Sequence, residues 1–208
     1  AFRGLGMDLE LLDWLNTYTF PEESKYAELA YAERAYGQFV DHLRRSATTR
    51  TAVFATIHAP ATELLMEKLE RSGLVSYVGK VNMDRNSPDY LREQSAAASV
   101  AATEEWICHT RDRFANTKPI LTPRFIPSCS DELLRGLRGL VEKYGLPVQS
   151  HLSENFGEIA WVQELCPDSK FYGDAYDRYG LFGGDHKCIM AHCVHSDERE
   201  LELMKKNG

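Results

Sequence analysis

Short apolar runs alternate with stretches that favour helix along most of the chain. The apolar runs predict five strands, at residues 49–57, 75–81, 119–125, 146–150 and 187–191. A helix is predicted after each strand, at residues 61–71, 88–114, 131–143, 154–165 and 197–206, and two more precede the first strand, at 8–17 and 24–45. Regular alternation of strands and helices is typical of α/β proteins with a parallel sheet.

Two α/β architectures fit this order, a closed (β/α)8 barrel and an open doubly wound sheet. No Gly-x-Gly-x-x-Gly fingerprint follows any predicted strand, which disfavours the open sheet as a dinucleotide-binding fold. A TIM-like barrel needs eight strands and typically about 250 residues. With about five βα units in 208 residues, we expect residues 1–208 to be part of a catalytic barrel domain.

Composition excludes several classes of protein. The net charge of −7, with no basic cluster, argues against a nucleic-acid-binding or membrane-binding surface. No apolar run approaches the roughly 20 residues that span a bilayer. The five cysteines are odd in number and lack Cys-x-x-Cys spacing, which fits reduced thiols and a cytoplasmic location.

Two histidines and a glutamate stand where barrel enzymes place their active sites. His151 and His192 each follow a predicted strand, and Glu154 comes three residues after the first histidine. The carboxyl ends of parallel barrel strands point into one site, so these side chains are expected to converge. Together they can supply a metal ligand and a proton shuttle, which suits hydrolysis by an activated water. Taken alone, each residue also fits a bland role: a hydrogen-bonded histidine closing a strand, or a glutamate at a helix N-terminus.

At these residues the chain resembles the guanine deaminases, a family within the amidohydrolase superfamily. The resemblance runs nearly end to end, and its blocks occur in order: residues 8–15 (DLELLDWL), 18–23 (YTFPEE), 54–58 (FATIH), 78–84 (VGKVNMD), 122–125 (TPRF), 149–155 (QSHLSEN) and 190–192 (MAH). It implies an amidohydrolase barrel with one zinc ion per subunit, usually a homodimer, that hydrolyses guanine to xanthine and ammonia.

The resemblance also implies a role for each candidate residue. His151 is expected to bind the zinc ion and to line the substrate pocket. Glu154 is expected to shuttle protons while contacting the substrate. His192 is expected to act on the attacking water, with direct coordination of the metal as the alternative. Arg124 and Phe125 are expected to contact the purine.

The chain departs from the family in the ligands that it lacks. Relatives carry a His-x-His pair just upstream of the position of Ala1 and an aspartate well beyond Gly208. We therefore expect the remaining zinc ligands to lie outside the chain, and the 208 residues alone to be inactive. Lys80, although on a strand, lies one strand too early to bridge two metals and is expected to be structural.

Two alternatives to guanine deamination remain open on the sequence. The first is an aminohydrolase of the same superfamily that acts on another purine, a pyrimidine or a triazine. The second is a non-catalytic barrel scaffold that has lost its metal site.

Overall fold

The computed structural model describes residues 4–208, so Ala1, where the predicted barrel segment begins, lies outside the described residues. In this described part of the chain, seven strands are present, and all of their pairings are parallel. β1 (Arg50–Phe54), β2 (Val75–Gly79) and β4 (Thr117–Pro119) form one sheet in that order. β3 (Val81–Asn82) pairs with β5 (Thr122–Pro123), and β6 (Val148–Leu152) pairs with β7 (Cys188–His192). A bridge between Leu121 and Val148 links the last pair to the rest.

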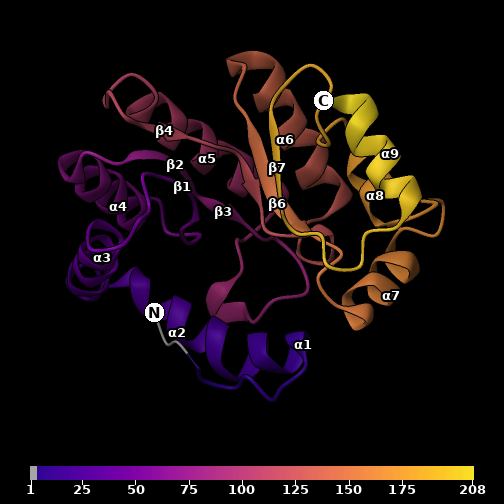
Figure 1. Cartoon of the computed structure of the whole chain (residues 1–208), viewed down its shortest axis with the longest axis horizontal. Coiled ribbons are helices and arrows are strands. Elements are labelled where there is room, and N and C mark those ends of the chain that lie inside the picture. Colours follow the sequence, from indigo (N-terminus) through magenta and orange to yellow (C-terminus); the bar gives the residue numbers. More distant parts are fainter. Residues whose placement is uncertain (1–3) are drawn as a thin grey trace.

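The order of the strands in space follows their order in the sequence. Each strand or broken strand lies beside the next one along the chain, without the reversal that defines a doubly wound sheet. The predicted α/β fold, part of a TIM-like barrel, is therefore confirmed, with five strand positions in its wall. The helices that follow the strands lie on the outer side of this wall (Figure 1).

Two strands that were predicted as continuous are each broken in two. The 119–125 strand gives the end of β4 and all of β5, and each of these pieces ends at a proline, Pro119 or Pro123, which has no N–H to donate to the ladder. The 75–81 strand breaks at Lys80. The Lys80 side chain is buried and its ammonium lies 2.5 Å from the Glu93 carboxylate, which fits the expected structural role.

The helices around the wall follow the predicted positions with some corrections. They are α4 (Ala59–Ser72), α5 (Ala96–Thr110), α6 (Asp131–Tyr144), α7 (Phe156–Leu165), α8 (Tyr172–Asp177) and α9 (Glu198–Asn207). Ser130 caps α6 and Asp197 caps α9. The 88–114 helix was predicted too long, because only a short turn, Asp89–Leu91, precedes Ser95, whose hydroxyl caps α5. Helix α8 was not predicted, since its single short turn contains Gly173 and shows no helical period.

Most of the predicted 24–45 helix is present as α3 (Leu29–Arg44), but the residues before it follow an irregular helical path instead of one helix over 8–17. The N-terminal segment consists of α1 (Leu11–Trp14), a π-helix (Leu15–Thr19), α2 (Phe20–Ser24), a 3-10 turn (Lys25–Ala27) and α3. The π-helix continues directly into α2, so residues 11–24 form one distorted helical segment. In Figure 1 α1 and α2 lie at one end of the strands.

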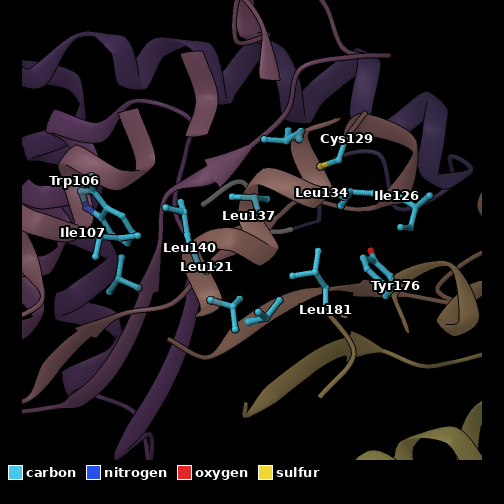
Figure 2. Close-up of a cluster of buried hydrophobic side chains, with 14 of the residues drawn as sticks. Trp106, Ile107, Leu121, Ile126, Cys129, Leu134, Leu137, Leu140, Tyr176 and Leu181 are labelled. Atoms are coloured by element: carbon cyan, nitrogen blue, oxygen red, sulfur yellow. The ribbon is translucent and has the colours of Figure 1, made fainter. Parts of the chain in front are cut away.

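The core lies between the strands and the outer helices. Leu134, Leu137 and Leu140 of α6 are buried against Leu121 on one side and Tyr176 of α8 on the other (Figure 2). Val148 and Leu152 of β6, the strand that carries His151, belong to the same buried cluster. Within residues 4–208, no helix has the length and apolar character needed to cross a bilayer.

Candidate active site

A cavity of about 230 Å³ opens at the carboxyl ends of the strands. All five residues singled out in the sequence line it. The complete lining consists of Leu11, Trp14, Leu15, Thr19, Arg124, Phe125, His151, Glu154, Glu158 and His192. Strand ends therefore form its floor and walls, while α1 and the π-helix cover it. The predicted convergence of His151, Glu154 and His192 is confirmed.

The imidazole of His151 is held in one orientation and one tautomer. Its Nδ1 lies 2.6 Å from the main-chain oxygen of Arg124, which only accepts, so Nδ1 carries the proton and Nε2 keeps a lone pair. The ring packs against Phe54, with centroids 4.3 Å apart, and stacks on His192 at 5.4 Å. Burial lowers the pKa of His151 to about 3, so the ring is neutral at pH 7. Neutral imidazole with a free nitrogen is the form that binds zinc.

Glu154 and His192 meet across the cavity. The Glu154 Oε2 atom lies 3.4 Å from His192 Nε2. Burial raises the pKa of Glu154, partly opposed by the positive charge of Arg124, and burial lowers the pKa of His192. A carboxyl group with a raised pKa and a neutral imidazole beside it are suited to exchange protons with a substrate near neutral pH.

His192 and two residues next to the pair, Ser153 and Cys193, adopt left-handed backbone conformations. Ser153 has φ +48°, His192 has φ +76° and Cys193 has φ +54°. Such conformations cost on the order of 1–3 kcal/mol each and persist only where surrounding contacts enforce them. For Ser153 the contact is a hydrogen bond of 2.8 Å from its hydroxyl to the buried Glu200 carboxylate.

Arg124 and Phe125, which directly follow β5, line the same cavity. The Arg124 Nη1 atom donates to Glu23 Oε2 of α2 at 2.7 Å, and the guanidinium carbon lies 5.0 Å from the centre of the Phe20 ring. Phe125 is buried, and its ring meets Trp161 edge-on, with centroids 6.4 Å apart. Both residues therefore line the cavity as predicted, while their contact with a purine stays a prediction.

Two acidic residues at the site were missed in the sequence. Glu158 is buried, accepts from the main-chain N–H of Glu154 at 3.1 Å and accepts from the Tyr172 hydroxyl at 2.7 Å. Its signal was present, because Asn155 and Glu158 have the N-cap and N3 spacing of a capping box. Glu23 had no such signal, since its partner Arg124 lies 101 residues away.

The donors in the cavity fit part of a zinc site. His151 offers Nε2, and the stacked ring of His192 brings a second imidazole beside it. In the part of the chain that the structure describes, no group of three or more His, Cys, Asp or Glu side chains is arranged to hold a metal ion. Zinc sites in enzymes use three protein ligands as a rule, so this set would be completed by donors other than the described residues.

Comparison with protein-family models places the whole chain in one family, because the model of the Amidohydrolase family matches residues 1–208. The chain belongs to the amidohydrolase family. Among solved structures, this amidohydrolase is similar to the guanine deaminase of C. acetobutylicum with bound guanine in the active site, with 53% identity and a TM-score of 0.94. That match covers 98% of this chain and 48% of the other.

Two curated relatives have similar descriptions. The chain is 43% identical to a guanine deaminase of Dictyostelium discoideum, over 97% of this chain and 44% of the relative. It is 42% identical to a probable guanine deaminase of Schizosaccharomyces pombe, over 99% of this chain and 39% of the relative. The amidohydrolase chain thus spans less than half the length of these relatives.

Proposed function

We propose that the amidohydrolase containing this chain is a guanine deaminase, which hydrolyses guanine to xanthine and ammonia. The observation that carries the proposal is that one cavity is lined by two chemically different groups of residues. His151, Glu154 and His192 can hold a metal and move protons, and Arg124 and Phe125 can contact a planar base. The similarity to a guanine deaminase with guanine bound supports the choice of substrate.

Arg124 and Phe125 would bind and orient the base. Guanine presents a carbonyl oxygen and ring nitrogens that accept hydrogen bonds, and a guanidinium donates to such acceptors in a fixed plane. Phe125 offers an aromatic side chain to the purine, and Trp14 and Leu15 of the covering segment add apolar surface. This arrangement would turn the amino-bearing carbon toward Glu154.

Glu154 would carry the protons. Hydrolytic deamination removes a proton from water, protonates a ring nitrogen and releases ammonia, and one carboxylate that reaches both water and base can perform these transfers. His192, 3.4 Å from Glu154, would hold the water and stabilise the charge that develops on it.

A single zinc ion per subunit fits this proposal. His151 would bind it through Nε2, with His192 as a further candidate ligand. When bound, zinc supplies the Lewis acidity that makes water a nucleophile at neutral pH. By resemblance we also propose a cytoplasmic homodimer, with no nucleic-acid or membrane partner.

Ammonia release by the full-length protein tests the proposal. We expect release from guanine and little from adenine, cytosine or melamine, with about one zinc ion per subunit by elemental analysis. Faster ammonia release from one of the other three compounds would mean that the protein is an aminohydrolase whose substrate is not guanine. Purified zinc-loaded protein that releases no ammonia from any of the four would favour the scaffold alternative and contradict the proposal.

A further inference from the structure

The guanidinium of Arg124 contacts two side chains of one short helix, α2. Glu23 accepts from Nη1 at 2.7 Å, and Phe20, one turn earlier in α2, places its ring 5.0 Å from the guanidinium carbon. Both partners of the ion pair are nearly buried, with side-chain exposures of 12% for Arg124 and 10% for Glu23. Arg124 lines the cavity whereas Glu23 does not, so the carboxylate lies behind the arginine as seen from the cavity.

This pairing leaves most of the donors of Arg124 unused. An arginine has five N–H donors in a planar fork. Within residues 4–208, the side chain forms one hydrogen bond, from Nη1 to Glu23. The bond at Nη1 and the Phe20 ring beside the guanidinium together limit the directions in which the other donors point, so these contacts set which donors are presented to the cavity.

Among the described residues, the Glu23 carboxylate accepts a hydrogen bond from Arg124 alone. Its other oxygen, Oε1, is buried and has no hydrogen-bond partner among the described residues. A buried carboxylate with an unsatisfied oxygen is costly, and a surface pair of the same type would avoid that cost. The neighbouring Glu22 shows the cheaper arrangement, since it pairs with Lys25 at 2.6 Å on the solvent side of the same helix.

The segment that carries Glu23 also covers the cavity. The π-helix Leu15–Thr19 runs into α2, and Leu11, Trp14, Leu15 and Thr19 contribute to the lining. A second contact connects this segment to the loop after β6, because Asn155, next to Glu154, donates to Glu10 at 2.7 Å. Glu23 is therefore placed to couple the cover of the cavity to the residue that orients the base.

We propose that Glu23 is a positioning residue that sets the orientation of the Arg124 guanidinium and thereby the discrimination of guanine from purines that lack its carbonyl group. The inference rests on the proposed deamination of guanine. Glu23 touches neither the substrate nor the reacting atoms in this account. It acts by removing the rotational freedom of Arg124 before the base binds, so that the donors need no reordering on binding.

The test compares Glu23→Gln with Glu22→Gln in the full-length protein. Glu23→Gln keeps the shape but removes the charge that holds Arg124, and we expect kcat/KM for guanine to fall about 10-fold, less than in Arg124→Ala and chiefly through a higher KM, with zinc content unchanged. Glu22→Gln should stay within about twofold of wild type, since Glu22 pairs with Lys25 and accepts from the Tyr31 hydroxyl and neither lines the cavity nor pairs with the Arg124 side chain. The preference for guanine over 2,6-diaminopurine, which has an amino group in place of the carbonyl, should narrow only in Glu23→Gln.

A double-mutant cycle with Arg124→Ala separates positioning from general stability. If Glu23 acts through Arg124, Glu23→Gln should have little further effect on kcat/KM in the Arg124→Ala protein. Additive losses, or wild-type kinetics in Glu23→Gln, would overturn the inference. If Glu23→Gln does not fold, Glu23→Asp replaces it in the cycle, since it keeps the charge but shortens the reach, and wild-type discrimination in that variant would contradict the positioning role. Failure of the wild-type protein to deaminate guanine would instead overturn the proposed function.

Discussion

The two groups of residues that line the cavity are held in place in different ways. His151, Glu154 and His192, here called the catalytic wall, stand at or just beyond the ends of the neighbouring strands β6 and β7 and are fixed by nearby backbone. Arg124 and Phe125, here called the binding wall, take their orientation from side chains far away in the sequence, above all Glu23 on α2. The catalytic wall depends on strand geometry, whereas the binding wall depends on a covering segment that docks against it.

Arg124 connects the two walls through separate groups. Its main-chain oxygen accepts from His151 Nδ1 and so helps to orient the candidate metal ligand. Its side chain pairs with Glu23 and faces the cavity. Substitution of the side chain leaves the carbonyl in place, so the two walls can be perturbed one at a time.

The largest expected effect comes from Glu154→Gln, which changes the catalytic wall alone. The amide cannot take a proton from water, so kcat for guanine should fall by about 10²- to 10⁴-fold while zinc content and KM stay close to wild type. Steady-state ammonia release and elemental analysis of the full-length protein measure both. Turnover at the wild-type rate would end the assignment of Glu154 as the proton carrier.

Arg124→Ala changes the binding wall and should have the next largest effect. Loss of the guanidinium removes donors to the base and leaves Glu23 buried without its partner, so kcat/KM should fall about 10- to 100-fold, while zinc content is retained. Arg135→Ala, on the exposed side of α6, serves as the control and should match wild type. Loss of zinc in Arg124→Ala would show that the two walls are not independent.

Glu158→Ala tests the backbone support of the catalytic wall. The change leaves the Glu154 N–H and the Tyr172 hydroxyl without their acceptor, and the free energy of unfolding should fall by about 1–3 kcal/mol. Glu158→Gln, which keeps an acceptor oxygen, should lose less. Urea unfolding gives both values. Equal stability of Glu158→Ala and wild type would mean that these hydrogen bonds do not stabilise the backbone at Glu154.

The pH dependence of the free energy of unfolding tests the buried, neutral ring of His151. Burial lowers the pKa of His151 to about 3, against about 6.5 in an unfolded chain, so the unfolded state binds the proton more tightly. The free energy of unfolding should therefore fall as the pH drops from about 6.5 toward 3 and should not depend on this group above 6.5. His151→Asn removes this contribution, so the stability difference between wild type and variant in urea should shrink from pH 7 to pH 5. A difference that is the same at both values would contradict the buried neutral ring.

The same contrast explains what the sequence could predict. The catalytic wall was predictable because apolar runs mark β6 and β7, and a parallel barrel brings their carboxyl ends together. The caps Ser130 and Asp197 were predictable because each bonds within its own helix turn. β4 and β5 end at Pro119 and Pro123, but the apolar pattern around these prolines predicts one continuous strand. The ion pair between Glu23 and Arg124 has no local signal, because only the folded chain brings α2 to the end of β5.

A crystal structure of the full-length Glu154→Gln protein with guanine tests most directly whether one base lies between the two walls. The account predicts the guanine carbonyl or a ring nitrogen within hydrogen-bond distance of Arg124 and the amino-bearing carbon directed toward residue 154 and His192. Guanine bound outside this cavity, or with its amino-bearing carbon turned toward Arg124, would contradict it.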